Sequence, residues 1–351
     1  MAAPLSTIDL DHILAHTREL WPEMRGKRIF ITGGTGFFGC WLVESFLHIN
    51  RVEQLGAQAT ILTRNPEAFR QKCPHLAFDP AITLLAGDVR DFAFPADLAE
   101  AEFRYVIHAA TETSARQGSA EPADIFETIV RGTERTLEFA ASHGTRKFLF
   151  TSSGAVYGPQ PPSITHIPED YVNASNSPDR VPAYGEGKCA AELLCARYSS
   201  AHAMECKIAR CFAFVGPHLP LDAHFAIGNF IRDAMRGDAI QVRGDGTPKR
   251  SYMYAADLTI WLWTILFRAP SLEPFNVGSD QALSILELAH VVAGTLGLKA
   301  DVEVAQAAEP GVPARQYVPC IDKAEKQLGL QCCVSLEDAI RRTAAWHGYR
   351  L

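Results

Sequence analysis

The chain has 351 residues, of which 47% are hydrophobic and 21% charged, and at roughly 150 residues per domain this length predicts about two domains or lobes. Its 33 basic and 40 acidic residues leave a net charge of −7, which argues against nucleic acid or an anionic membrane as the main partner. No apolar stretch has the length of a membrane span and the start has no signal-peptide pattern. We therefore expect a soluble, cytoplasmic protein.

The nine cysteines include no C-x-x-C pair and no spacing typical of a zinc site. They favour a reducing environment. His12 and His16 lie one turn apart on a predicted helix, but the sequence places no carboxylate or thiol near them to complete a metal site. We therefore predict no metal.

Residues 1–26 are predicted to form a helical extension, in which Ser6 and Asp9 have the spacing of a capping box. Apolar residues recur along it at helical period, namely Leu10, Ile13, Leu14 and Trp21. This apolar face must be covered either by the body of the lobe or by a second subunit.

From residue 28 onward, short apolar runs alternate with amphipathic stretches, which is the pattern of parallel strands covered by helices on both faces. The runs are Arg28–Thr32, Ala59–Thr63, Ile82–Ala86, Tyr105–His108, Lys147–Thr151 and Lys207–Ala209. We predict an α/β fold with a doubly wound parallel sheet of the Rossmann type over residues 27–212 and 251–280. Residues 213–250 and 281–351 are predicted to form a smaller, mostly helical substrate lobe.

A glycine-rich turn follows the first predicted strand and leads into a helix. Its glycines permit a tight turn, let backbone N–H groups approach a pyrophosphate and bring the positive helix N-terminus toward the anion. A turn without a ligand is the alternative, but the strand before it and the helix after it favour a dinucleotide site. The residues assigned to that site are Gly33, Thr35, Gly36, Phe37, Phe38 and Gly39.

The second predicted strand ends at Thr63 and Arg64, where an NAD enzyme usually has an acid for the ribose 2′-hydroxyl. Thr63 does not repel a 2′-phosphate and Arg64 can pair with one, which favours NADP(H), with NAD(H) possible. The alternative is that Arg64 is a solvated turn residue. Asp88, after the third strand, is placed to accept a hydrogen bond from an adenine amino group or to cap a turn.

Tyr184 and Lys188 are four residues apart at the start of a predicted helix, so the phenol and the ammonium share one face. The cation and an oxidised nicotinamide both favour phenolate, and we expect them to lower the pKa of Tyr184 toward working pH. Tyr184 can then exchange a proton with a carbinol and ketone pair. Ser153 leaves the fifth strand at the edge where such sheets bind ligands, and its hydroxyl can contact the reacting oxygen.

Together these residues resemble the extended short-chain dehydrogenase/reductase superfamily, and within it the NAD-dependent epimerase/dehydratase family that acts on nucleotide sugars. The similarity covers nearly the whole chain after residue 27. It rests on the order and spacing of motifs at 32–39, 106–110, 132–133, 152–158, 184–188, 244–257 and 275–278.

The resemblance implies that Ser153 binds the substrate carbonyl, that Tyr184 is the acid/base and that Lys188 holds the nicotinamide ribose. It also implies a homodimer and a nucleoside diphosphate sugar as substrate. Further cofactor contacts are assigned to Val89, Ala109 and Ala110, and further substrate contacts to Thr111, Asn229, Arg250 and Arg315. For Asn229, Arg250 and Arg315 the alternative is a surface charge or a cap.

The chain departs from the family pattern at three places. Family 4,6-dehydratases have an Asp-Glu pair after the catalytic hydroxyl, and here those positions are Gly154 and Ala155. Two family asparagines are replaced by Ile129 and Ala213, which removes polar contacts to the substrate. The segment 168–182 is longer than a minimal connection and is expected to shape sugar specificity.

These observations predict a nucleotide-sugar oxidoreductase in which hydride moves between nicotinamide C4 and the hexose, most readily at its C4. A 4-keto-sugar reductase is favoured because the missing acid after the second strand points to NADPH. A 4-epimerase that recycles its cofactor is the alternative, 4,6-dehydration is disfavoured, and a non-catalytic NADP sensor is a further alternative.

Overall fold

The protein is described from a computed structural model, which places residues 1–94, 101–111, 121–172, 182–223, 225–297 and 301–350. A seven-stranded sheet forms the centre of the larger lobe, in the order β11-β6-β5-β4-β1-β2-β3, and every neighbouring pair in it is parallel. Its strands are β1 (Arg28–Thr32), β2 (Gln58–Thr63), β3 (Ile82–Ala86), β4 (Tyr105–His108), β5 (Lys147–Ser153), β6 (Glu205–Cys211) and β11 (Pro274–Val277).

All six predicted strands are present, and the predicted α/β fold with a doubly wound sheet is confirmed. The chain runs outward from β1 to β3 and then returns to continue from β4 on the other side of β1. The strand order therefore reverses between β1 and β4. In open α/β sheets, the crevice at the carboxyl ends of two such strands is where ligands bind.

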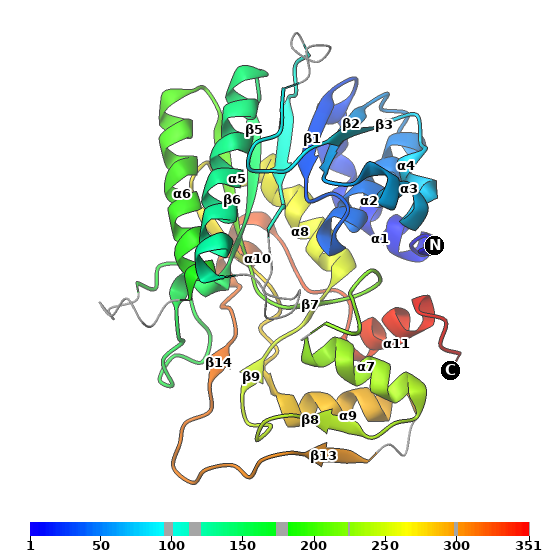
Figure 1. Ribbon diagram of the computed structural model, residues 1–351, viewed down its shortest axis with the longest axis vertical. Coiled ribbons are helices and arrows are strands. Elements are labelled where there is room, and N and C mark those ends of the chain that lie inside the picture. The colour runs from blue at the N-terminus through cyan, green and yellow to red at the C-terminus, as the bar shows by residue number, and fades with distance from the viewer. Residues whose placement is uncertain (95–100, 112–120, 173–181, 224, 298–300, 351) are drawn as a thin grey trace.

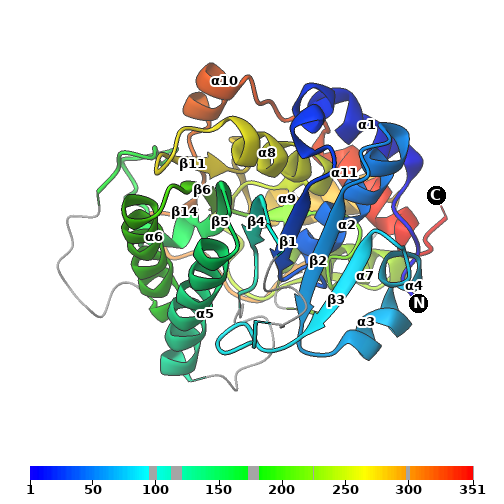
Figure 2. The same cartoon turned by 90° about the horizontal axis from the view of Figure 1, so that it is seen from above.

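Helices cover both faces of the sheet (Figure 2). One face carries α2 (Phe37–Val52), α3 (Pro66–Lys72), α4 (Pro74–Ala77) and α8 (Ala255–Arg268), and the other carries α5 (Pro122–Ser142) and α6 (Ala183–Ala201). Side chains of β1 alternate between the two faces of the sheet, so they contribute to two separate hydrophobic cores. Ile29 and Ile31 belong to the core under α2 and α8, and Phe30 belongs to the core under α5 and α6.

The N-terminal extension consists of α1 (Thr7–Thr17) and a 3₁₀ helix (Arg18–Met24). Its apolar face is covered by the body of the same lobe: Leu10, Ile13 and Leu14 are buried, and the rings of Trp21 and Trp263 on α8 meet edge to face at 4.9 Å. The first of the two predicted alternatives is therefore correct.

Ser6 caps α1 as predicted, because its hydroxyl accepts a hydrogen bond from the Ile8 N–H. The expected capping box is wrong in its second half. Asp9 is only 1% exposed, and its carboxylate accepts hydrogen bonds from the Tyr254 hydroxyl at 2.9 Å and from Arg342 at 2.6 Å. A carboxylate with two such partners remains with them and does not turn back to the helix N-terminus.

The smaller lobe lies beyond one end of the sheet (Figure 1). Its helices are α7 (Ala226–Arg236), α9 (Ile285–Thr295) and α11 (Leu336–Trp346). They are joined by short strands that the sequence did not indicate: β8 (Ile240–Val242) pairs with β13 (Val302–Val304), and β9 (Lys249–Arg250) lies between β12 (Leu283–Ser284) and β14 (Gln316–Tyr317). Strands of two or three residues are too short to produce an alternating pattern.

Three further elements lie where the two predicted lobes meet. β7 (Phe214–Val215) pairs in parallel with β10 (Met253–Tyr254). α10 (Asp322–Leu328) packs at the β11 edge of the large sheet, where the Lys323 ammonium donates to the Pro274 carbonyl oxygen at 3.0 Å. The domain boundaries given above stay a prediction. None of the described helices is long and apolar enough to cross a membrane.

Replacement of Asp9 by alanine tests how far α1 depends on its buried carboxylate. Asp9→Ala leaves Arg342 and the Tyr254 hydroxyl without their partner, and we expect the free energy of unfolding to fall by roughly 3 kcal/mol in urea denaturation. The control is Asp11→Ala, because Asp11 is an exposed residue of the same helix that pairs only with His48; its effect should stay below about 1 kcal/mol. Equal effects in the two variants would contradict this account of α1.

Candidate functional site

The glycine-rich turn connects β1 to α2 at the carboxyl end of the sheet. Gly33 has a φ of +72°, and a Cβ there would lie 2.5 Å from the Ala109 carbonyl carbon. A Cβ on Gly39 would lie 2.2 Å from the Gly33 carbonyl oxygen. Only glycine fits at these two positions, because the turn is packed directly against the end of β4 and the start of α2.

The first turn of α2 suits an anion. Gly36 is its N-cap residue and supplies no side-chain hydrogen bond to the helix, so N–H groups of Phe37 and Phe38 remain available beside Thr35. Ala109 and Ala110 approach the same turn from β4, and both of their N–H groups are held by Thr32, at 3.2 Å each. The turn, the helix N-terminus and the end of β4 thus form the cradle that a pyrophosphate requires.

The residues predicted to contact the adenosine half are close together. Arg64 is exposed at the end of β2, and its charge contributes to lowering the pKa of Asp88. The largest cause of that lowering is a hydrogen bond from Arg90, whose guanidinium lies 2.8 Å from the Asp88 carboxylate. Asp88 also accepts from the Arg90 N–H, so it caps this turn, and Val89 beside it packs against Gly132.

Four hydroxyl groups from distant parts of the chain meet at the end of β5. The Ser153 hydroxyl lies 3.4 Å from the hydroxyl of Tyr317 on β14, and the hydroxyls of Ser153 and Thr111 both favour the phenolate of Tyr184 at the start of α6. Thr111 Oγ1 is buried and has no hydrogen-bond partner among the described residues. Buried hydroxyl groups normally have a hydrogen-bond partner, so the Thr111 hydroxyl is available to bond a substrate oxygen next to the predicted acid/base.

Lys188 lies under Tyr184 and is almost fully buried. Its ammonium donates to the Thr151 carbonyl oxygen at 2.8 Å and lies 5.7 Å from the Tyr184 ring centre. Burial lowers the pKa of Lys188 to about 8 and raises the pKa of Tyr184. Loss of hydration is the largest cause of the raised pKa of Tyr184, and the expected lowering, which also depends on an oxidised nicotinamide, stays a prediction.

A buried ion pair holds the helix that carries these residues. Glu192, two turns after Tyr184, accepts two hydrogen bonds from Arg210 on β6, at 2.8 and 3.0 Å. The Ser152 hydroxyl donates to the same carboxylate. Arg210 also donates to the Tyr157 hydroxyl, which in turn donates to Asn276 on β11. Three neighbouring strands and α6 are thus joined by one polar network.

The departures from the family pattern are filled by apolar packing. A Cβ on Gly154 would lie 2.6 Å from the ring of Phe212, so this ring occupies the space of a side chain at position 154. Phe212 also packs on Tyr317, with ring centres 4.7 Å apart. Ile129 packs against Gly187 on α6. The chain therefore places no acid next to Ser153 at the Asp-Glu positions, and it closes that side of the site with aromatic rings.

Two of the predicted diphosphate contacts approach the catalytic hydroxyls from the smaller lobe. Arg250 on β9 lies over the Tyr317 ring at 5.5 Å, and burial lowers its pKa, with a smaller contribution in the same direction from Arg315. Tyr317 connects this arginine pair to Ser153. Sequence reasoning missed Tyr317. This residue lies in a strand of only two residues, more than 160 positions after Ser153, so no local sequence pattern indicates that the two side chains meet.

Asn229 has a different neighbourhood. Its side-chain oxygen accepts from Arg232 at 3.1 Å, and it lines an open pocket of the smaller lobe together with Arg232, Asp233 and Arg243. No contact joins it to Arg250, so its role as a diphosphate contact stays a prediction. Most of the segment 168–182 lies outside the described residues.

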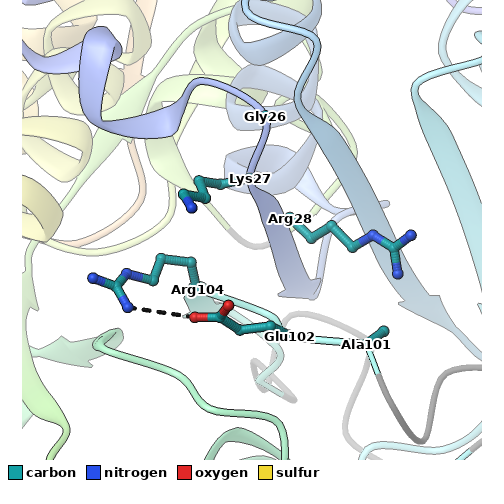
Figure 3. Close-up of a pocket in the computed structure, with 6 residues that line it drawn as sticks. All are labelled: Gly26, Lys27, Arg28, Ala101, Glu102 and Arg104. Atoms are coloured by element: carbon teal, nitrogen blue, oxygen red, sulfur yellow. Dashed lines mark hydrogen bonds and ion pairs between the residues drawn. The ribbon is translucent and has the colours of Figure 1, made fainter.

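A second pocket lies at the opposite end of the strands, before β1 and β4 (Figure 3). It is lined by Gly26, Lys27 and Arg28 before β1, and by Ala101, Glu102 and Arg104 before β4. Arg104 pairs with Glu102 at 3.3 Å. This pocket lies at the amino ends of the strands and shares no residue with the cluster around Tyr184.

A comparison with protein-family models matches residues 29–278 to the "NAD dependent epimerase/dehydratase family". Among curated proteins, the chain is 30% identical over 313 residues to UDP-glucuronic acid decarboxylase 6 of Arabidopsis thaliana, covering 89% of this chain and 86% of that one. It is 27% identical to UDP-glucuronic acid decarboxylase 1 of Danio rerio over 94% of this chain and 74% of the relative.

Solved structures with the same fold include a UDP-galactose 4-epimerase, at a TM-score of 0.69 and 26% identity, covering 90% of this chain and 97% of that one. They also include a dTDP-glucose 4,6-dehydratase from Streptomyces venezuelae with NAD bound, at a TM-score of 0.76 and 23% identity, covering 91% of this chain and 96% of that one. The second likeness supports the fold alone.

The variant Gly36→Ala tests whether the turn binds a dinucleotide. A Cβ there would meet nothing closer than 3.4 Å, so the fold should tolerate it, but the methyl group would stand between the N–H groups and a pyrophosphate. We expect NADH affinity to fall roughly ten- to a hundredfold in fluorescence titration, the range for losing hydrogen bonds to a charged group. Gly294→Ala, in open space on α9, is the control. Unchanged NADH binding in Gly36→Ala would contradict a pyrophosphate site at this turn.

Proposed function

Because the chain belongs to the NAD dependent epimerase/dehydratase family, we propose that it oxidises and re-reduces C4 of a nucleoside diphosphate hexose. The observation that carries this proposal is the convergence of Ser153, Tyr184 and Tyr317 over the buried Lys188, beside a turn in which only glycine fits. The residues of the glycine-rich turn, Gly33, Gly36 and Gly39, would hold the dinucleotide, and a bound nicotinamide would supply the hydride acceptor and donor for C4 of the sugar.

The protein's own residues handle the proton. Tyr184 takes the proton from the C4 hydroxyl during oxidation and gives it back during reduction. Ser153 donates a hydrogen bond to the same oxygen and so favours its ketone form. Lys188 supports the tyrosinate, since a cation next to a phenol favours its charged form. Thr111, whose hydroxyl is buried without a partner, is proposed to contact a sugar hydroxyl.

The smaller lobe is proposed to hold the nucleoside diphosphate. Arg250 lies over the Tyr317 ring, and Arg315 is near enough to contribute to lowering the pKa of Arg250, so the two arginines bring positive charge toward the Ser153 hydroxyl. Arginine pairs of this kind suit phosphate oxygens. The diphosphate at this position would direct the sugar toward Tyr184.

The relatives favour a reaction that recycles its cofactor. A C4 ketone makes the carboxylate on C5 part of a β-keto acid, which can lose carbon dioxide and leave an enolate. The enolate takes a proton from water at C5 before C4 is reduced, and neither step uses an acid and base at positions 154 and 155. Decarboxylation of a hexuronic acid and C4 epimerisation both fit a site with Gly154 and Ala155. The 4-ketoreductase favoured by the sequence depends on NADP, and the comparisons do not support an NADP preference. Net reduction therefore becomes the alternative.

The charges near Arg64 do not by themselves select the cofactor, because the Asp88 carboxylate near Arg64 is already paired with Arg90. NAD is proposed as the cofactor because the matched family is NAD dependent. The homodimer and the cytoplasmic location stay predictions.

An activity panel tests this function. The purified protein is incubated separately with UDP-glucuronate, UDP-glucose and a dTDP-4-keto-hexose, each with and without NADPH. We expect carbon dioxide release from UDP-glucuronate or formation of the C4 epimer of UDP-glucose, with no NADPH consumed. Stoichiometric NADPH oxidation with the 4-keto sugar, and no reaction otherwise, would establish the reductase instead.

The variant Tyr184→Phe tests the catalytic assignment. Loss of the phenol should lower kcat by roughly two to four orders of magnitude, the range that general acid/base groups supply, and leave NADH binding nearly unchanged. Tyr198→Phe is the matched control, because Tyr198 lies on the same helix and stacks on His202. Near-normal turnover by Tyr184→Phe would remove this residue from the mechanism.

A further inference from the structure

Two thiols and an imidazole come together inside the protein, away from the catalytic hydroxyls. Cys40 lies in the first turns of α2, Cys73 lies between α3 and α4, and His218 lies in the loop after β7. The three ligand atoms are all within 4.8 Å of one another, and all three residues are buried. Segments far apart in sequence thus deliver the donor set that soft divalent cations prefer.

His218 is held in this position without any hydrogen bond. Its side chain is 0% exposed, and neither ring nitrogen has a hydrogen-bond partner among the described residues. Its φ of 69° lies in the left-handed region, which is unfavourable for a residue with a side chain. Trp346 packs on the ring at 4.6 Å. A buried imidazole with both nitrogens unpaired is costly, and a bound cation would remove that cost.

A carboxylate lies at the edge of the same cluster. Glu44 follows Cys40 by one helical turn, and its Oε2 atom lies 3.9 Å from the Nε2 atom of His218. The same oxygen is 3.4 Å from His75, whose side chain is 25% exposed and marks the side from which an ion can enter. Glu44 is thus within reach as a fourth ligand, or as the carboxylate that orients a liganding histidine.

A positive charge lies beside the cluster. The Lys72 ammonium donates to the Thr35 carbonyl oxygen at 3.3 Å, and the Cys40 thiol lies 3.7 Å from the same oxygen. Lys72 therefore offsets part of the negative charge that two thiolates and Glu44 would leave around a divalent ion.

We propose that Cys40, Cys73 and His218, with Glu44 as the fourth ligand, bind one zinc-class divalent cation. Zinc–thiolate bonds of about 2.3 Å in a tetrahedron place two sulfurs about 3.8 Å apart, within the spread of this cluster. Binding releases the thiol protons and joins α2, the α3–α4 junction and the loop before α7. The role is structural, because four protein ligands leave no open position for a substrate.

The location links this site to the glycine-rich turn. Cys40 directly follows Gly39, and its thiol lies 3.7 Å from the Thr35 carbonyl oxygen, which also accepts from Lys72 at 3.3 Å. A cation held by Cys40 would therefore fix the start of α2 from the side opposite the turn. The proposal does not depend on which sugar reaction the protein catalyses.

A second cluster provides a matched control. His12 and His16 lie near Cys333, and the His16 Nε2 atom is 3.8 Å from its sulfur. This corrects the expectation that no thiol is near these histidines, because Cys333 is brought there from the far end of the chain. Cys333 and His16 are exposed, however, and the Nδ1 atom of His16 already bonds to the His12 carbonyl oxygen.

The test is metal analysis of the full-length protein, produced without an affinity tag in zinc-supplemented medium. We expect about one zinc per chain, lost in Cys73→Ser and in His218→Gln but retained in Cys333→Ser. Cobalt added after chelation should give thiolate charge-transfer absorption and intense visible bands in the wild type and in Cys333→Ser. Zinc removal should lower the midpoint of thermal unfolding by several degrees, since the cation binds only the folded state.

Three results would overturn the proposal. These are less than a tenth of an equivalent of zinc in the wild type, zinc loss confined to Cys333→Ser, or a disulfide between Cys40 and Cys73 in protein alkylated at lysis. If Cys73→Ser does not fold, His218→Gln and the wild-type cobalt spectrum decide, because a site without thiolates gives no charge-transfer band. Binding of NADH, measured in parallel, separates loss of the metal from loss of the fold.

Discussion

The largely buried ion pair between Glu192 on α6 and Arg210 on β6 is the contact on which the arrangement of the proposed catalytic residues depends. Both side chains are about 15% exposed or less, and removing one partner of such a pair costs up to roughly 3–5 kcal/mol. The pair fixes the height and rotation of α6 against the sheet. Tyr184 and Lys188 lie on that helix, and Ser152, next to Ser153, bonds to the same carboxylate. One interaction thus sets the relative position of Ser153, Tyr184 and Lys188, the three residues proposed to be catalytic.

The close packing of the glycine-rich turn between β1 and α2 is a second constraint. The turn at Gly33 is packed so closely against Ala109 and Gly39 that no side chain fits, which places the α2 N-terminus next to the end of β4. The ion pair and the close turn together hold the proposed proton-transfer group, Tyr184, and the proposed anion site at the α2 N-terminus. Phe212 and Tyr317 occupy the position where family dehydratases have acids, which fits the proposed proton exchange at one hydroxyl.

The sequence predicted the features that have a local cause. Continuous apolar runs identified the strands, the glycine spacing identified the turn, and the four-residue spacing identified Tyr184 and Lys188; the family match and the fold confirm the resemblance. Contacts between distant residues were not predictable. Tyr317 contacts Ser153 from a strand of two residues. The Asp9 carboxylate bonds to Tyr254 and Arg342 and does not cap its own helix. His218 lies beside Cys40 and Cys73, although the three residues are far apart in the sequence. The burial that raises the pKa of Tyr184 was not predictable either, because desolvation depends on packing that the sequence does not display.

The most direct test of the central claim follows the hydrogen at C4 of the sugar. UDP-glucuronate and UDP-glucose deuterated at C4 are each converted by the purified protein in unlabelled water without added reductant, and the product is examined by NMR. If one site removes and returns the hydride while Tyr184 exchanges only the hydroxyl proton, the product keeps its deuterium at C4. Product that has lost the label, or that forms only when NADPH is supplied, would contradict the account.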